Sequence, residues 1–241
     1  MTAAPSNSVL DAVQALERAP SISKLKEIFR TSAERHGYSM FLCSAPPPVY
    51  DVTTNPILYD EWPGEWKRQC VQQKHYLNDP MLSELHRTAE PFLWSDAQKR
   101  KPGTRAEREV MAEAAIVGMC EGFVVPIYGI GGQVHGMTIA GTMPRVDSYA
   151  KAELHLLSMY AYARAKILHR RTGAPPVSIG RRDREALHWA AAGKTDWEIG
   201  EILRISESAA HKRIENAKRK LGVATRMQAV VEAIRGGYIQ I

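Results

Sequence analysis

The stretch from Gly193 to Ile214 reads GKTDWEIGEILRISESAAHKRI and decides how the C-terminal part of the chain folds. Thr195 is followed three residues later by Glu198, which is the pattern of a capping box and predicts a helix start. Ser206 can cap the next helix, so that only residues 204–205 connect the two. Two short helices joined this closely cross steeply, and the second is free to enter a DNA major groove.

The region from Val177 to Ile241 is therefore predicted to be a four-helix DNA-binding domain, whose last helix runs from Arg226 to Arg235 and ends at Gly236-Gly237. It carries 12 Lys and Arg against 8 Asp and Glu, whereas the other 176 residues carry 20 against 18. Attraction to phosphate is the natural use of such an excess. Charge alone leaves open a merely soluble basic domain.

The helix predicted over residues 207–220 is the one expected in the groove, where its first turns would meet base edges. The candidates for base contacts share one helix face and are Ser208, His211, Lys212 and Glu215. Lys and His can donate to guanine, and Glu can accept from cytosine. The candidates for phosphate contacts, which position without reading sequence, are Lys194, Arg213, Lys218, Arg219 and Lys220. A solvated helix end favoured by the helix dipole explains the last three equally well.

The length of 241 residues suits two modest domains better than one large one. Residues 170–176, RRTGAPP, break the helical periodicity and are expected to link a first domain, 1–169, to the second, 177–241. No apolar run approaches the length of a membrane span, and residues 1–9 lack a signal-peptide pattern, so we expect a cytosolic protein. The three cysteines are scattered, which favours reduced, buried thiols over a disulfide framework or a zinc site.

The first domain alternates helical and extended patterns. Helices are expected over 10–18, 22–36, 63–73, 81–87, 104–117 and 148–169, and strands over 39–44, 49–53, 123–127 and 134–140, with a turn at Gly131-Gly132. Thr104 and Glu107 form a further capping box. The expected fold class is an α/β sandwich, in which helices flank a central antiparallel sheet. The last of these helices carries an apolar stripe, Leu154, Leu157, Ala161, Ala165 and Leu168, that suits either a core or a dimer seam.

Two groups of residues give the chain a family resemblance. In the first domain they are Trp62-Pro63, Trp66, Asp79-Pro80, Phe92, Trp94, Gly122 and Pro126. In the second they are Leu187, Gly193-Lys194-Thr195, Glu198-Ile199, Ile202-Leu203, Ile205-Ser206-Glu207, Lys220-Leu221-Gly222-Val223 and Ala229. With them, nearly the whole chain resembles the LuxR-type quorum-sensing transcription regulators. The second group alone is shared with response regulators, so the first makes the resemblance specific.

The resemblance implies an N-acyl homoserine lactone as ligand. The indole of Trp66 would then donate to the lactone oxygen, Asp79 would accept from the amide N–H, and Thr138 would bind the amide carbonyl. Trp62 and Trp94 would supply apolar walls, as expected of a pocket with few polar groups. Taken singly, each tryptophan is more often a core residue, and Asp79 before Pro80 more often a helix cap.

The chain departs from the family pattern in three places. They are Cys70 where the family has a Tyr, Asp183 where Glu is usual, and Ala209-Ala210, in place of the usual Thr-Val, near the start of the helix expected in the groove. Cys70 leaves room in the pocket wall, and Trp62 narrows another side. We therefore expect an acyl group that is short but bulky, branched or aryl. Repacking of Met or Leu side chains into the gap is the alternative.

The resemblance implies a ligand-responsive activator that has no enzyme activity and needs no cofactor or metal. It would bind a palindromic promoter site as a homodimer, partly through the last helix, and recruit RNA polymerase. A regulator that answers to another small molecule, or that represses, stays open. A lactone-processing enzyme is disfavoured because the sequence has no His-rich metal motif and no nucleophile flanked by glycines. A phosphorylation-gated response regulator is disfavoured because acidic residues do not cluster at early strand ends.

Overall fold

A computed structural model describes residues 8–44, 57–100, 103–129, 134–144, 147–172 and 178–240, with the side chains of 170–172 left out. The described residues up to Tyr128, together with those from Val134 to Thr172, form one compact unit, and residues 178–240 belong to another. Each unit is described by itself.

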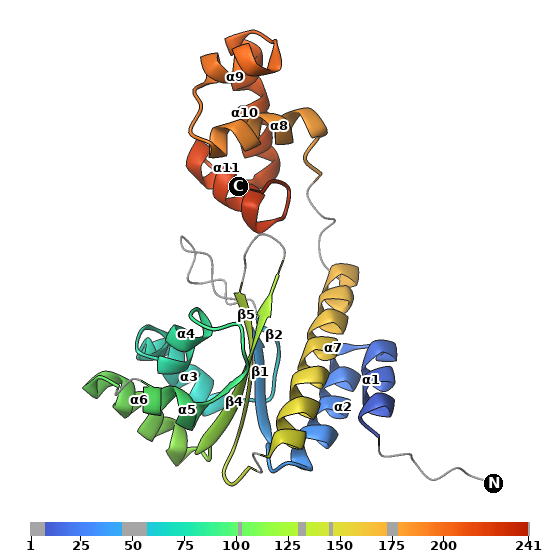
Figure 1. The fold of residues 1–241 in the computed structure, drawn as a ribbon, viewed down its shortest axis with the longest axis vertical. Coiled ribbons are helices and arrows are strands. Elements are labelled where there is room, and N and C mark those ends of the chain that lie inside the picture. Colours follow the sequence, from blue (N-terminus) through green and yellow to red (C-terminus); the bar gives the residue numbers. More distant parts are fainter. Residues whose placement is uncertain are drawn as a thin grey trace, which may run out of the picture. The chain divides into compact units, whose positions relative to one another are not determined.

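The first unit contains both helices and strands (Figure 1). Its helices are α1 (Val9–Arg18), α2 (Ile22–Glu34), α3 (Gly64–Gln72), the 3-10 helix η1 (His75–Leu77), α4 (Pro80–Leu85), α5 (Trp94–Arg100), α6 (Arg105–Ile116) and α7 (Ser148–Thr172). Its strands are β1 (Met40–Ser44), β2 (Ile57–Asp60), β3 (Phe92–Leu93), β4 (Glu121–Tyr128) and β5 (Val134–Gly141).

The strands form one sheet in the order β2-β1-β5-β4-β3, and every neighbouring pair is antiparallel. At its centre, Thr138 of β5 lies opposite Leu42 of β1 and Val124 of β4. This confirms the expected antiparallel sheet. The two edge strands, β2 and β3, were not expected from the sequence, while the expected strand 49–53 and the turn at Gly131-Gly132 lie outside the described residues.

The sheet separates two apolar cores, because successive side chains of a strand point to opposite faces. Met137 and Ile139 of β5 belong to the core that the sheet shares with α1, α2 and α7. Ala140 of the same strand belongs to the second core, shared with α3, α4, α5 and α6. Figure 1 shows these two groups of helices on opposite faces of the sheet, and the α/β sandwich is confirmed.

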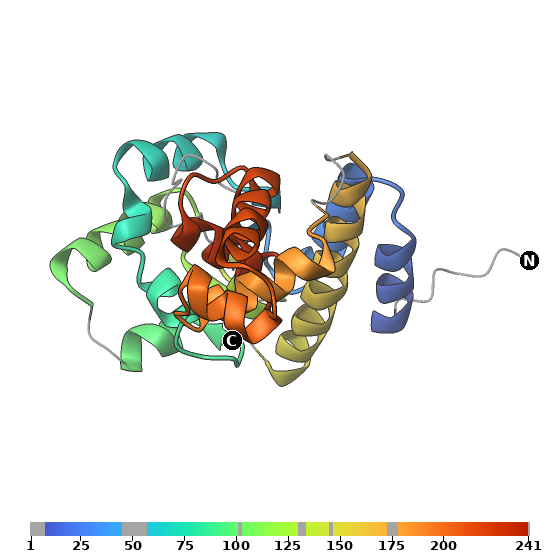
Figure 2. The same cartoon turned by 90° about the horizontal axis from the view of Figure 1, so that it is seen from above.

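Helix α7 buries the apolar stripe noted in the sequence, so that stripe is core and not a dimer seam. It packs beside α1 and α2, as Figure 2 shows from above. The helix continues to Thr172, three residues beyond the expected end, so that residues 170–172 of the expected linker are helical. The rest of that linker, 173–176, lies outside the described residues.

Two other boundaries differ from expectation for local reasons. Helix α2 ends at Glu34 and not at His36, because Gly37 follows with a positive φ of 79°. Helix α4 begins one residue earlier than expected and ends at Leu85, with Asp79 as its N-cap and Pro80 in the first turn. The thiols also differ, since Cys43 is buried but Cys70 is only partly buried and Cys120 is exposed.

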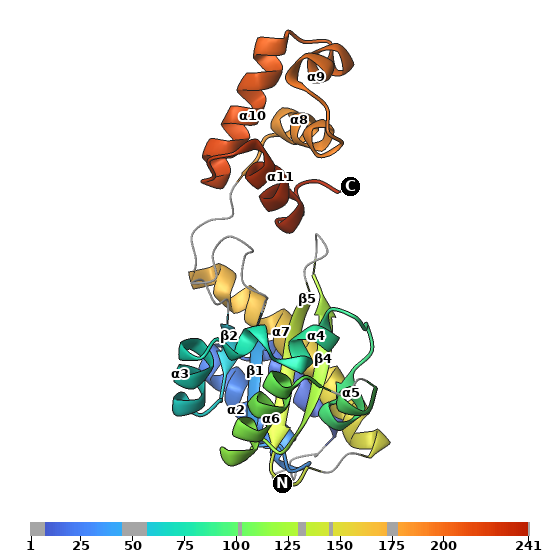
Figure 3. The ribbon, with the colours of Figure 1, turned by 90° about the vertical axis from the view of Figure 1, so that its left-hand side faces the viewer.

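The second unit is formed by four helices, which Figure 3 shows from the side: α8 (Arg181–Ala191), α9 (Asp196–Leu203), α10 (Glu207–Leu221) and α11 (Arg226–Arg235). The expected capping box of Thr195 and Glu198 opens α9, and Ser206 caps α10 through the backbone N–H of Ala209. The turn between them places Arg204 in the left-handed region, with φ 54°. A Cβ at Gly200 would lie 2.9 Å from the carbonyl of Ile205, so this close crossing requires glycine.

The contact of Gly122 with Trp94 gives a test of the second core. A Cβ at Gly122 would lie 2.3 Å from the Trp94 indole, whereas one at Gly64 would meet nothing within 4 Å. Gly122→Ala is therefore expected to destabilise the first unit by about 1–3 kcal/mol through overpacking, and Gly64→Ala to change stability by less than about 1 kcal/mol. Calorimetric melting of the full chain checks both, and equal melting temperatures would contradict this packing.

Candidate ligand-binding and DNA-binding sites

Three tryptophans meet in the core between the sheet and α3–α6. Trp66 on α3 and Trp94 at the start of α5 are buried, and Trp62, just before α3, packs against the same core. Among the described residues, the Nε1 atom of each indole is buried without a hydrogen-bond partner. A buried donor left unpaired costs about 1–3 kcal/mol. Three such donors on one side of the sheet point to a polar partner that the described residues do not supply.

Asp79 brings a carboxyl group to the same side of the sheet. It is the N-cap of α4, and its Oδ1 accepts from the backbone N–H of Met81 at 2.8 Å. Burial raises the pKa of this carboxyl, while the backbone hydrogen bonds from Met81 and Leu82 and the charge of His75 act in the opposite direction. The helix cap and the proposed ligand contact are compatible, because capping uses one of two oxygen atoms.

Two further side chains, those of Cys70 and His75, lie close to Trp66 in this core. The His75 ring stacks on Trp66 with 5.4 Å between centroids, and its Nε2 lies 2.9 Å from Oε2 of Glu113. Gln69 donates to the same Glu113 oxygen at 2.6 Å. Burial raises the pKa of the Cys70 thiol to about 12, helped by the charges of Asp79 and Glu113, so this thiol is neutral. His75 was not predicted from the sequence as a neighbour of Trp66, although it lies only four residues before Asp79.

Thr138 lies on the sheet face that packs against the tryptophans. It is partly buried on β5, between its strand neighbours Leu42 and Val124. Val124 belongs to the same core as Trp66 and Trp94. The structure thus brings Trp62, Trp66, Cys70, Asp79, Trp94 and Thr138 to one side of the sheet.

The expected base-contacting residues lie on α10 of the second unit. Ser208, His211, Lys212 and Glu215 are all exposed. Ala210 and Ile214 are buried on the opposite side of the helix against α8, α9 and α11. The helix therefore presents one polar face to a possible partner.

Most of the expected phosphate contacts already hold partners within the chain. Lys194 pairs with Glu198 at 2.9 Å, Lys218 with Glu215 at 2.7 Å, and Lys220 with Asp183 at 2.8 Å. Arg219 donates to the side chain of Asn216 at 2.6 Å. Arg213 is only partly exposed. The exposed Lys194–Glu198 pair is worth little, so a phosphate can replace Glu198 at small cost. The Asp183 side chain is only 12% exposed, so releasing Lys220 from it would cost more.

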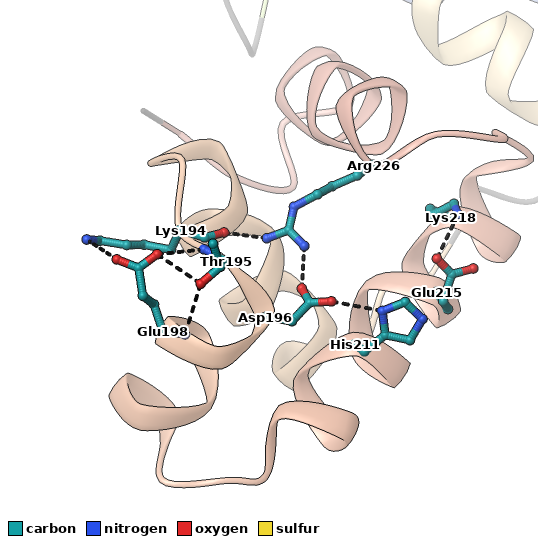
Figure 4. A network of polar contacts seen from close by, with 8 residues as sticks. All are labelled: Lys194, Thr195, Asp196, Glu198, His211, Glu215, Lys218 and Arg226. Atoms are coloured by element: carbon teal, nitrogen blue, oxygen red, sulfur yellow. Dashed lines mark hydrogen bonds and ion pairs between the residues drawn. The ribbon is translucent and has the colours of Figure 1, made fainter.

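A second polar network ties α9, α10 and α11 together (Figure 4). Asp196 accepts from Nδ1 of His211 at 2.8 Å and from the guanidinium of Arg226, which also donates to the backbone carbonyl of Lys194. Burial acts to raise the pKa of the Asp196 carboxyl, but the hydrogen bonds from Arg226 and His211 outweigh it and lower the pKa. This network was not predicted from the sequence, because its members are far apart along the chain.

Comparison with known families matches both units. Residues 21–165 match the autoinducer binding domain, and residues 177–233 match the bacterial regulatory proteins of the luxR family. The chain belongs to the LuxR family. Its first unit is an autoinducer-binding domain, and its second is a helix-turn-helix DNA-binding domain.

Individual LuxR-family relatives match along almost their whole length. The chain is 30% identical over 226 residues to the transcriptional activator protein BjaR1 of Bradyrhizobium diazoefficiens, covering 94% of this chain and 93% of the relative. It is 30% identical over 232 residues to the quorum sensing-dependent transcriptional regulator RpaR of Rhodopseudomonas palustris, covering 96% and 93%. The crystal structure of Escherichia coli SdiA shares the fold, with a TM-score of 0.77 at 18% identity over 96% of this chain and 98% of that one.

These LuxR-family relatives are transcriptional regulators and not enzymes. Among the helices of the described residues, none combines the length and apolar character needed to cross a membrane.

The raised pKa of Asp79 predicts how an Asp79→Asn variant responds to pH. A carboxyl whose folded pKa lies above its unfolded value stabilises the fold at low pH, and that contribution is lost as pH rises through the folded pKa. Asn can still accept from Met81 but never ionises. The variant without ligand is therefore expected to melt above the parent protein at pH 7, with the difference shrinking toward pH 4.

Asp96→Asn, a change of the same charge on α5, serves as the control and should show no such pH-dependent gain. Differential scanning calorimetry from pH 4 to pH 8 measures both variants. A lower melting temperature of Asp79→Asn at pH 7 would contradict the assigned burial.

Proposed function

We propose that this protein is a cytosolic, ligand-responsive transcription activator of quorum sensing. An N-acyl homoserine lactone binds between the sheet and α3–α6 and stabilises a homodimer. The dimer binds a palindromic promoter site through α10 and recruits RNA polymerase. The family membership supports the ligand class and the DNA partner in outline.

The observation that carries the ligand proposal is the group of buried indole N–H atoms without partners, together with Asp79. A lactone offers a carbonyl that accepts from Trp66 and an amide N–H that donates to Asp79. Each pairing removes the cost of a buried polar group left unsatisfied. Thr138 lies on the sheet face where its hydroxyl can donate to the amide carbonyl.

The acyl group is proposed to be short and branched or aryl. Cys70 packs against the tryptophan core with a side chain much smaller than tyrosine. Trp62 adds an indole to the same core and would narrow another side of the ligand site. A flat ring or a branched chain fills such a space better than a long straight chain.

The dimer proposal draws on an exposed stripe of α7, opposite the buried one. Tyr149, Leu156, Met159 and Ile167 recur at helical spacing and are 63%, 37%, 40% and 46% exposed. Apolar side chains at this spacing along one helix suit a helix pair with a second copy of the chain.

The alternative is a LuxR-family regulator that responds to another small molecule or represses its promoter. The relatives leave the sign open, since BjaR1 is named as an activator and RpaR only as a regulator. The unpartnered donors favour a ligand that carries acceptors, which includes molecules other than lactones.

A panel of aryl, branched and straight-chain acyl-homoserine lactones tests the ligand. We expect aryl or branched lactones to raise the melting temperature of the full chain most, with about 2.7 kcal/mol of stabilisation at 100 times the dissociation constant. Trp66→Phe removes the indole N–H together with part of the buried ring, and should weaken this binding at least about tenfold. Cys70→Tyr should weaken binding of aryl lactones more than of straight ones.

Trp189→Phe, in the core of the second unit, is the matched control and should leave lactone binding unchanged. A clear preference for long straight chains would contradict the proposed acyl group. Indifference to every lactone, with Trp66→Phe behaving as the parent protein, would favour the alternative.

The exposed stripe of α7 gives a separate prediction. Met159→Glu places a charge on the stripe and is expected to weaken dimerisation by roughly tenfold or more. Met143→Glu makes the same change at a residue outside α7 that is 88% exposed, and should leave the dimer intact. Sedimentation velocity of the full chain with bound lactone measures both. Equal dimer fractions for the two variants would contradict a dimer contact through the exposed stripe of α7.

A further inference from the structure

One ring nitrogen of His211 contacts a carboxylate of the chain, while most of the ring is exposed to solvent. Its Nδ1 lies 2.8 Å from Oδ2 of Asp196, and the other oxygen of that carboxylate accepts from Arg226 (Figure 4). The side chain of His211 is nevertheless 62% exposed, while that of Asp196 is only 19% exposed. The carboxylate is thus fixed inside the helix-turn-helix, and the imidazole projects from it on the outer face of α10.

The partners of Asp196 decide where the His211 proton lies. The hydrogen bonds from His211 and from the guanidinium of Arg226 keep this carboxyl ionised, and an ionised carboxylate can only accept hydrogen bonds. The ring nitrogen that faces it, Nδ1, must therefore be the donor. In a neutral imidazole the other nitrogen, Nε2, then carries the lone pair.

We propose that Asp196 is a positioning residue for DNA recognition, which fixes the tautomer and direction of His211 so that Nε2 reads one base of the operator. The inference rests on the proposed role of α10 in the major groove. His211 lies in the second turn of that helix, among the turns that meet base edges in helix-turn-helix proteins.

This arrangement assigns a base class to the contact. With a neutral ring, Nε2 accepts, and the major-groove donors are the amino groups of cytosine N4 and adenine N6. With a protonated ring, Nε2 donates, and its partners are the O6 and N7 acceptors of guanine. The preferred base at this position therefore changes from cytosine or adenine to guanine when the ring gains a proton.

The charged groups around the ring are few and come from three helices. They are Asp196 of α9, Arg226 of α11 on the far side of that carboxylate, and on α10 the neighbouring Lys212, with Glu207 and Glu215 one turn away, the latter paired with Lys218. The proposed base recognition needs both the carboxylate of Asp196 and the imidazole of His211. A purely structural role would require the contact only for stability, and a contact whose histidine is 62% exposed contributes little to it.

The experiment begins with the full chain, bound to whichever lactone yields soluble dimer, or to none. Selection from a duplex library with 20 random base pairs gives the operator at pH 8. Fluorescence anisotropy then compares this duplex with its single-base variants at pH 6 and pH 8. The proteins are the parent, Asp196→Asn, His211→Gln and the control Glu201→Gln, which removes an equal charge from an exposed position of α9.

At pH 8 the parent should prefer cytosine or adenine over guanine at one position of each half-site, by about threefold to tenfold. At pH 6 that preference should reverse. Asp196→Asn and His211→Gln should lose the pH dependence at this position alone, while Glu201→Gln keeps it. Histidine-selective nitrogen NMR of the full chain should show His211 protonated at Nδ1 at pH 8 in the parent, and as a mixture of tautomers in Asp196→Asn.

The outcomes separate this inference from the proposed function. A chain that enriches no sequence contradicts both. If the selected operator is bound but His211→Gln changes no base preference, or if the preference of the parent is the same at both pH values, the reading role of His211 is wrong. Unchanged preferences in Asp196→Asn, with the NMR tautomer also unchanged, overturn the positioning role. Should Asp196→Asn not fold, the His211→Gln measurements and the parent NMR spectrum decide.

Discussion

The buried polar groups between the sheet and α3–α6 constrain the first unit more than any other feature. Within the described part of the chain, three indole N–H groups have no hydrogen-bond partner there, and burial raises the pKa of the Asp79 carboxyl. Each group lowers the stability of the empty domain, because desolvation is not offset by hydrogen bonding. A ligand that satisfies even two of them stabilises the folded state directly.

The second unit is constrained differently, because the polar groups at its helix ends and helix crossings are paired within the unit. Capping boxes open α9 and α11, Ser206 caps α10, and Asp196 links three helices. Gly200 and the left-handed Arg204 fix the crossing of α9 and α10. The helix-turn-helix is therefore preorganised, which reduces the entropy lost when DNA binds.

The sequence predicted what depends on local chemistry. Helix starts followed from capping residues such as Thr104 and Thr195, and the β4–β5 pairing followed from two apolar strands. The edge strands were missed because two to four residues are too few to show alternation. The family resemblance supplied Trp66 and Asp79, whereas the stacking of His75 and the Asp196–His211 contact depend on tertiary packing that no local pattern encodes.

Strand β5 serves both cores with alternate side chains, since Ile139 packs toward α7 and Ala140 toward α5 and α6. Inserting or deleting one residue within β5 would turn the side chains of one face toward the other core. Large side chains such as Ile139 would then point into space that fits only small ones such as Ala140. Natural length variation in such proteins must therefore be confined to connections outside the central strands. Directed evolution of new ligand specificities has the same boundary, because a substitution on β5 keeps the alternation of its side chains whereas a change of its length does not.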